Sequence, residues 1–159
     1  MKSKLYQFCF GLVLFSLAAC AVPPPLPEDP EDKAMYFYLN EADYQSWAFW
    51  PEKEGLQPST FPHGSFAKTY VNKEALEAIQ KKFATLPVGS VVVSENFRPD
   101  KTLGMIAVMY KKEGYNQQAG DWFWAQYNQD GKLRREGKLV YCLGCHQKQK
   151  QQDYLFSNF

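Results

Sequence analysis

One short stretch near the C-terminus constrains this chain more than any other: Cys142-Leu143-Gly144-Cys145-His146. Two thiols at this spacing can each add across a vinyl group of a haem, and the histidine beside the second thiol can place its imidazole on the iron. The pattern C-x-x-C-H therefore predicts covalent attachment of haem c through Cys142 and Cys145, with His146 as the iron ligand. A chain built around this stretch must fold into a pocket that faces it.

A C-x-x-C pair has two other common uses, as a redox dithiol and as half of a zinc site. A thioredoxin-like dithiol should open a helix within a βαβ unit, whereas this pair follows a strand-like run at 138–141. A four-ligand zinc site needs a second Cys/His pair. The only other histidine is His63, and Cys9 and Cys20 belong to the N-terminal region described next. Haem attachment is therefore the favoured interpretation.

The N-terminus has the three parts of a bacterial export signal. Lys2 and Lys4 precede an apolar run at 8–17, and small residues follow it up to Cys20. The run is shorter than the roughly 20 residues that a membrane span needs, so a cleaved signal peptide over 1–19 is the better interpretation. Export also suits the haem motif, since c-type haem is attached in an exporting compartment.

The residues around the predicted cleavage point, Leu17-Ala18-Ala19-Cys20, look like a lipobox. In lipoproteins this box directs cleavage before the cysteine and diacylation of its thiol, so Cys20 is the expected lipidation site. Ala21, rather than Asp, in the next position resembles an outer-membrane address. The mature protein is expected to be lipid-anchored and to face the periplasm from the outer membrane. An ordinary cleaved signal is the alternative.

Charge and composition narrow the classes of partner. The chain has 18 basic and 17 acidic residues, and loss of Lys2 and Lys4 with the signal leaves 16 against 17, a formal charge of −1. Such a balance argues against a nucleic-acid partner. Residues 20–33 are rich in proline and acids, which predicts an extended, solvated linker. The remaining 34–159 has the length of one domain, and its many aromatic residues suit a haem pocket or an aromatic β core.

Periodicity in this domain is typical of an antiparallel sheet. Runs with strand character, separated by turns, predict strands at 66–71, 90–97, 102–111, 121–128 and 132–141. Helices are predicted over 41–47, with Asn40 as N-cap, and over 73–84, with Asn72 as N-cap. A polar helix at 147–152 follows the motif. The expected fold is α+β: a mainly antiparallel β-sheet of about five strands with a few packing helices, in a single haem-binding domain.

The last predicted strand carries one charge on an otherwise apolar face. Simple alternation places Leu133, Arg135, Gly137, Leu139 and Tyr141 on the same side. A buried charge usually needs a partner or a role. Arg135 is therefore either half of an ordinary ion pair or the candidate for the distal side, where its guanidinium would stabilise bound NO or an oxyanion.

Several runs of the sequence resemble one family. They are Met109-Tyr110-Lys111-Lys112-Glu113-Gly114-Tyr115, Gly120-Asp121-Trp122-Phe123-Trp124, the C-x-x-C-H motif and Asp153-Tyr154-Leu155-Phe156, with His63-Gly64 and Tyr70-Val71-Asn72 before them. Together they are similar to the cytochrome P460 and cytochrome c′-β family over nearly the whole mature domain. The resemblance implies a mostly antiparallel β domain, commonly a homodimer, whose haem has the motif histidine as proximal ligand and an open distal side.

Within that family the resemblance favours gas binding over oxidation. In the branch that oxidises hydroxylamine, a lysine on the strand similar to 89–95 is cross-linked to the haem, and the corresponding residue here is Ser94. Serine cannot make that amine link, which moves the resemblance toward the c′-β side. Iron with a single protein ligand binds NO, CO or a nitrogen substrate. The leading hypothesis is a five-coordinate cytochrome that binds or detoxifies NO.

Two other functions stay open. A simple electron-transfer cytochrome would need a sixth ligand such as Met105 or Met109, although methionines in the middle of a strand are more often core residues. An oxidoreductase of the P460 type, acting on hydroxylamine or NO, would need another lysine for the cross-link, such as Lys68. Either function would also require a redox partner, whose identity is unknown.

Overall fold

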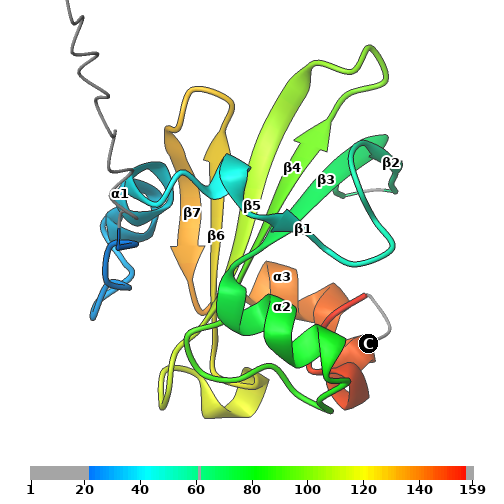
Figure 1. Ribbon diagram of the computed structural model, residues 1–159. Helices are drawn as coiled ribbons and strands as arrows, with labels where there is room; N and C mark the ends of the chain where they lie inside the picture. Colours follow the sequence, from blue (N-terminus) through cyan, green and yellow to red (C-terminus); the bar gives the residue numbers. More distant parts are fainter. Residues whose placement is uncertain (1–21, 61, 157–159) are drawn as a thin grey trace, which may run out of the picture.

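The computed structural model describes residues 22–60 and 62–156, which include almost the whole predicted domain (Figure 1). The predicted signal peptide at 1–19 and the predicted lipidation site Cys20 lie outside the described residues. Within the described part of the chain, the structure contains no helix that is both long and apolar enough to cross a membrane.

A seven-stranded sheet forms the body of the domain, and its pairings are antiparallel. The strands follow the order β1-β3-β4-β5-β6-β7, and β2 pairs with β3 outside this path. This confirms the predicted α+β class. The sequence does not predict β1 and β2, because strands of two residues carry no alternation. The strands are β1 Ala48–Phe49, β2 Gln57–Pro58, β3 Phe66–Val71, β4 Val91–Phe97, β5 Leu103–Lys111, β6 Trp122–Asn128 and β7 Leu133–Gly137.

Three α-helices and three 3₁₀-helices connect and cover these strands in the described residues. The α-helices are α1 Ala34–Glu41, α2 Lys73–Gln80 and α3 Val140–His146, and the 3₁₀-helices are η1 Tyr44–Ser46, η2 Gln117–Ala119 and η3 Gln147–Gln152. The start of α2 is as predicted, since the Asn72 side chain accepts a hydrogen bond from the backbone N–H of Ala75 at 3.2 Å.

The helix predicted over 41–47 is largely wrong, because the α-helix forms earlier as α1 and only the short 3₁₀-helix η1 falls within the predicted range. Met35, Tyr38 and Leu39 lie at helical spacing and are buried, so they supply the apolar stripe of α1. The chain turns away soon afterwards at Asp43, whose φ of 46° is left-handed and cannot continue a helix. The position of the helix is therefore set by the apolar residues before Asn40, and Asn40 lies inside the helix rather than capping its start.

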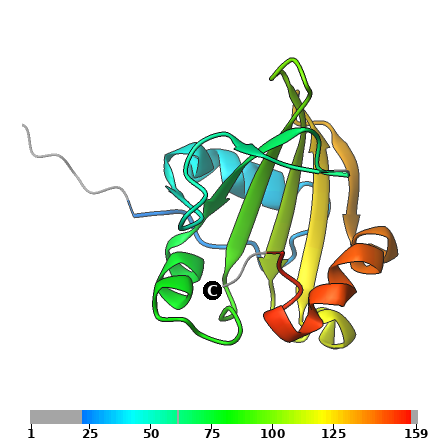
Figure 2. The same cartoon turned by 90° about the vertical axis from the view of Figure 1, so that its right-hand side faces the viewer.

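The sheet has two different faces, because alternate residues of each strand point to opposite sides. One face packs against α1 through an aromatic cluster that includes Tyr70, Phe123 and Tyr127, and we call it the closed face. The other face packs against α2, α3 and the last described residues, 153–156, which we call the C-terminal segment. The contact is made through a cluster that includes Trp122 and Trp124 (Figure 2). We call this second face the open face, because a cavity separates part of it from these elements.

The chain leaves the sheet after β7 at Gly137, where a positive φ of 106° lets the backbone turn. The N–H of Leu139 donates to the Gly137 carbonyl at 3.0 Å, and α3 begins at Val140. The strand-like assignment of 138–141 is therefore wrong, and the C-x-x-C-H motif lies on a helix. Val140 and Tyr141, the apolar side chains that favoured a strand, are exposed.

Part of the predicted linker is packed on the domain. Pro30 is fully buried, Leu26 packs against the closed-face cluster, and the Glu31 carboxylate accepts a hydrogen bond from the Tyr115 hydroxyl at 2.6 Å. The chain is thus in contact with the domain from about residue 26, earlier than the boundary that composition predicts. A proline-rich composition predicts an extended chain, but it does not determine whether that chain docks.

Candidate functional site

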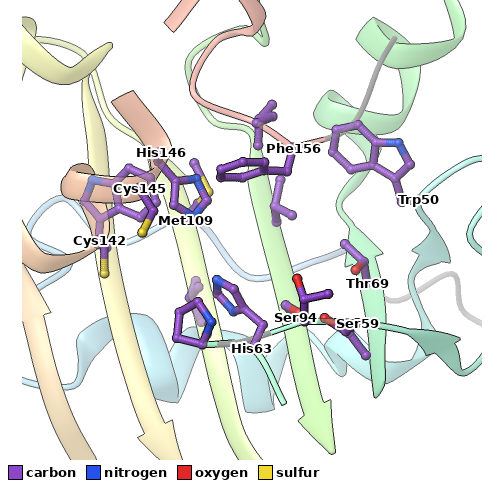
Figure 3. Close-up of a pocket in the computed structure, with 18 of the residues that line it drawn as sticks. Trp50, Ser59, His63, Thr69, Ser94, Met109, Cys142, Cys145, His146 and Phe156 are labelled. Atoms are coloured by element: carbon purple, nitrogen blue, oxygen red, sulfur yellow. The ribbon is translucent and has the colours of Figure 1, made fainter. Parts of the chain in front are cut away.

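A cavity of about 740 Å³ lies between the open face and the C-terminal segment (Figure 3). Its floor is a row of residues that are partners across four neighbouring strands: Thr69, Ser94, Ala107 and Gln126. All but the last are small. Because larger side chains at these positions would fill the space, the row explains why the open face is hollow here. The volume is within the range of roughly 300–1,000 Å³ that is usual for cofactor sites.

The predicted haem-attachment residues meet at one side of this cavity. Cys142, Cys145 and His146 occupy positions i, i+3 and i+4 of α3, so their side chains share one face of the helix. All three line the cavity (Figure 3). Local helical spacing therefore does what the motif requires, since it places two sulfur atoms and an imidazole beside the same space.

The His146 imidazole is held in one orientation. Its Nδ1 lies 2.6 Å from the carbonyl oxygen of Tyr154, so Nδ1–H donates this hydrogen bond and Nε2 is left free. The ring makes edge contacts with Trp124 and Phe156, at centroid distances of 4.7 and 5.1 Å. Burial lowers the pKa of His146, and the Tyr154 carbonyl partly offsets this effect. A neutral imidazole with a free Nε2 is the form that binds a metal.

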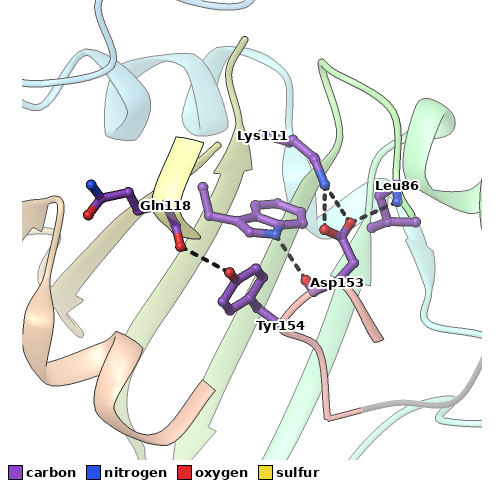
Figure 4. Close-up of polar contacts among 6 residues, drawn as sticks. Leu86, Lys111, Gln118, Asp153 and Tyr154 are labelled. Carbon is purple, nitrogen blue, oxygen red and sulfur yellow. Dashed lines mark hydrogen bonds and ion pairs between the residues drawn. The ribbon is translucent and has the colours of Figure 1, made fainter. Parts of the chain in front are cut away.

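The Tyr154 carbonyl is in turn fixed by a buried clamp at the start of the C-terminal segment (Figure 4). Asp153 is 3% exposed, and its two carboxylate oxygens lie 2.5 and 2.6 Å from the Lys111 ammonium. The backbone N–H of Leu86 donates to the same carboxylate at 2.8 Å, and the Trp122 indole donates to the Asp153 carbonyl at 3.0 Å. An ion pair with further hydrogen bonds therefore holds the segment that orients the proximal imidazole.

The Cys142 thiol does not have the properties of a redox thiol or a zinc ligand. Burial raises the pKa of the Cys142 thiol to about 11, although the nearby Arg135 guanidinium lowers it. Such a thiol is protonated at neutral pH, whereas redox dithiols and zinc ligands act as thiolates. Within the described residues, no group of three or more His, Cys, Asp or Glu side chains could hold a metal ion. The two alternative uses of the C-x-x-C pair are therefore disfavoured.

Two lysines add positive charge to the wall of the cavity. Lys53 and Lys148 are lining residues, and the Lys53 ammonium donates to the carbonyl oxygen of Phe156 at 3.4 Å. Burial lowers the pKa of Lys53. Haem carries propionate groups, which basic side chains can pair with. Two thiols, an oriented imidazole, aromatic walls and nearby lysines together fit a c-type haem.

The structure does not support the expected role of Arg135. Arg135 pairs with Gln126 but Leu133 pairs with Tyr127, because a bulge in β7 adds one residue between them. Leu133 and Arg135 therefore point to opposite faces of the sheet. Arg135 is exposed, does not line the cavity, and lies over the Tyr141 ring with its guanidinium carbon 4.9 Å from the centroid. The prediction that Arg135 is a buried charge is wrong, and its place outside the cavity lends no support to a role beside a bound ligand.

Of the residues considered for the other two functions, some line the cavity and others do not. Ser94 is on the cavity floor, where its hydroxyl donates to the Asn96 side-chain oxygen at 3.1 Å. Lys68, on the opposite side of β3, does not line the cavity. Of the two methionines considered as ligands, Met109 lines the cavity and Met105 does not. The position that resembles the family's cross-linking lysine thus faces the site, but it carries a hydroxyl.

His63 has no role predicted from the sequence, yet its side chain enters the same cavity as His146 (Figure 3). The two ring centroids are 6.1 Å apart. Burial lowers the pKa of His63, and the neighbouring Asn96 side chain opposes this shift. The signal in the sequence is small: His63 is the only histidine outside the motif, and it precedes a glycine in a turn-rich loop.

The C-x-x-C-H motif lies on a helix beside a cavity large enough for a cofactor. This arrangement is the one expected of a haem-binding domain. The comparison with known families agrees, since the family model described as Cytochrome P460 matches residues 41–157. The match spans most of the chain, so this chain belongs to the cytochrome P460 family, as the resemblance predicts, and a haem cofactor follows from that membership. No functionally curated protein matches the sequence significantly.

Proposed function

We propose that this chain is a c-type mono-haem cytochrome that binds NO or another small nitrogen ligand in the cavity. Cys142 and Cys145 would hold the haem covalently, and His146 would be its proximal ligand. The observation that carries the proposal is the hydrogen bond between His146 Nδ1 and the Tyr154 carbonyl, because it leaves Nε2 free beside the two thiols. Haem iron with an exchangeable position binds small nitrogen ligands.

The residues of this chain would position the haem and shield its proximal ligand from solvent. The helical spacing of α3 sets where the thiols and the imidazole lie, and the Asp153 clamp holds the segment that orients the ring. Trp124 and Phe156 cover the imidazole with aromatic rings. The small residues of the cavity floor leave room for a flat cofactor above the sheet. Apolar residues such as Trp50, Val92 and Leu155 line the cavity beside the two lysines, and apolar surroundings favour a small neutral ligand such as NO over a charged one.

The second candidate function is oxidation of hydroxylamine or NO by an enzyme of the P460 type. The cross-linking amine of that branch has no counterpart at Ser94, and Lys68 is outside the cavity. Electron transfer with a methionine as sixth ligand, the form predicted from the sequence, would rest on Met109, which does line the cavity. Ligand binding is favoured because it needs neither a cross-link nor a methionine ligand.

The lipobox supports a second part of the proposal, that the mature protein begins at a lipidated Cys20 and faces the periplasm from the outer membrane. Since Leu26 already contacts the domain, the tether would span about six residues, or about 20 Å when extended. The domain would then lie close to the membrane surface. We expect wild-type protein in the membrane fraction and a Cys20→Ser variant that is released or left unprocessed. Light scattering of a lipid-free form tests the homodimer that the resemblance implies.

The test of the main proposal uses protein matured in a host that attaches c-type haem. Its intact mass should exceed that of the processed apo chain by one haem, and Cys145→Ser should lose most of the covalent haem. The ferrous protein should bind one NO per haem, with a change in the Soret band. A holoprotein of the expected mass that does not respond to NO would contradict the function alone, whereas a chain of apo mass would contradict haem attachment as well.

A further inference from the structure

His63 and His146 approach the same space from opposite sides. The ring centroids are 6.1 Å apart and the ring planes are at 81° to one another. His146 is at the end of α3, whereas His63 comes from the turn that precedes β3 (Figure 3). Both side chains line the cavity.

This separation matches that of two imidazoles bound to one iron. With C–N bonds of about 1.33 Å, the atoms of an imidazole ring lie about 1.1 Å from its centroid. Metal–nitrogen bonds are about 2.0 Å, so two imidazoles on opposite sides of one metal have centroids about 6.2 Å apart. A diatomic ligand held between the iron and His63 would require a longer separation. We infer that His63 is the second axial ligand of the haem in the resting protein.

Backbone contacts hold His63 at this distance. Its N–H donates to the Thr60 carbonyl at 2.9 Å. The next residue, Gly64, has a φ of 79°, and a Cβ there would lie 2.5 Å from the Phe97 carbonyl oxygen. Ser65 then donates its N–H to that same oxygen at 2.9 Å. The turn is pressed against the end of β4, so a fixed backbone rather than a free loop presents the imidazole.

We expect the two imidazoles to offer the same atom. The Nδ1 of His63 is buried near the Asn96 side chain, with no hydrogen-bond partner of good geometry in the described residues, and it is therefore covered by protein. Nε2 is then the nitrogen expected to face the haem. In His146, Nδ1 is engaged with the Tyr154 carbonyl and Nε2 is again the free nitrogen. Haem iron accepts one such ligand on each side.

Met109 is the other potential ligand in the cavity, but its position is different. It is the strand partner of Trp124, whose ring lies 4.7 Å from the His146 ring, measured between centroids. Met109 therefore lies on the same side of the cavity as the proximal imidazole. A sixth ligand has to come from the opposite side, which is where His63 lies.

This inference rests on the proposed function and changes how it would work. The resemblance implies an open distal side, whereas a second histidine closes that side in the absence of ligand. NO would compete with the His63 imidazole for the iron, and its binding rate would depend on how often the imidazole leaves. Such a site selects ligands strong enough to replace an imidazole.

The first test is the spectrum of the ferric wild-type holoprotein without added ligand. We expect low-spin iron with the strongly anisotropic electron paramagnetic resonance signal of near-perpendicular imidazole planes, and no methionine–iron band. His63→Ala with the same haem content should be high-spin, and added imidazole should restore the low-spin signal. Met109→Leu is the matched variant for the alternative ligand, and it should stay low-spin.

NO kinetics separate this inference from the proposed function. His63→Ala should bind NO at least about tenfold faster than wild type, because only molecules with His63 dissociated are competent. High-spin wild-type protein, or a fully loaded His63→Ala protein that stays low-spin, would overturn the assignment. A low-spin protein that binds no NO would support His63 as the iron ligand and contradict NO binding. A high-spin protein that binds NO would support NO binding and contradict His63 as the ligand.

Discussion

The closed and open faces of the sheet share the same strands but are packed in opposite ways. On the closed face, large side chains such as Phe123 and Tyr127 are fully buried against α1 and its surroundings. On the open face, the same strands present Ser94, Ala107 and Gln126 to a cavity of about 740 Å³. Residue size at alternating positions, not strand pairing, therefore decides which face is solid and which can receive a cofactor.

The two faces also differ in how their polar groups are used. On the closed face, the Glu95 carboxylate is 3% exposed and accepts hydrogen bonds from the Tyr44 hydroxyl at 2.9 Å and the Gln45 amide at 2.6 Å. These groups satisfy one another within the core. On the open face, the His146 ring uses Nδ1 for the protein and keeps Nε2 free. The Glu95 carboxylate thus uses both partners for stability within the core, whereas the His146 ring keeps one nitrogen for binding.

The largest loss of stability is expected on the closed face. Phe123 is fully buried there, so Phe123→Ala should lower the free energy of unfolding by about 3–5 kcal/mol through lost burial and a residual cavity. Urea titration followed by circular dichroism measures this loss. The haem spectrum should stay the same, because the side chain points away from the cavity. A shifted Soret band in the folded variant would contradict the separation of the two faces.

The matched change on the open face is Ala107→Leu, which fills the cavity floor instead of emptying the core. We expect less haem per chain and an altered spectrum in the protein that does take up haem. The loss in unfolding free energy should be smaller, about 1–3 kcal/mol, because added methylenes strain a site without removing a large buried side chain. An unaltered spectrum at full haem content would show that the row is not the floor of the haem site.

A loss of stability second only to that of Phe123→Ala is expected at the clamp behind the open face. Asp153→Asn removes the charge that compensates Lys111, whose side chain is 11% exposed, and should lower the free energy of unfolding by about 3–4 kcal/mol. The control is Asp130→Asn, which breaks an exposed ion pair with Lys132 and should cause no measurable loss. Equal losses in the two variants, measured in urea, would show that the clamp is no stronger than a surface pair.

A smaller effect is expected from Gly64→Ala, where backbone and site are coupled. A side chain at this positive φ costs about 1–2 kcal/mol, and its Cβ would meet the Phe97 carbonyl oxygen. The turn must shift, so the haem spectrum should change together with stability. Gly114→Ala is the control, since its φ of 71° is similar and a Cβ there would meet nothing within 4 Å. If both variants keep the wild-type spectrum, the turn does not position a ligand.

The sequence by itself determined the features that depend on neighbours along the chain. The cap at Asn72 and the five longer strands follow from local geometry, and the structure has each of them, although the last strand ends at Gly137. The spacing of the motif is also fixed by the sequence, but the helix that carries it was not predicted. Alternation also predicts that Ser94 and Ala107 fall on one side of adjacent strands once their pairing is known. The family resemblance, carried by short motifs, is confirmed over 41–157.

Only the tertiary structure decided what depends on register and on contacts between distant segments. A single extra residue in β7 turns Arg135 to the face opposite Leu133, because strand side chains alternate with a period of two. Val140 has strand propensity, yet the chain has already left the sheet and begun a helix. His63 meets His146 because the turn before β3 packs against the end of β4. Such meetings leave no periodic pattern in the sequence, since the segments that make them come together only when folding closes the long loop between them.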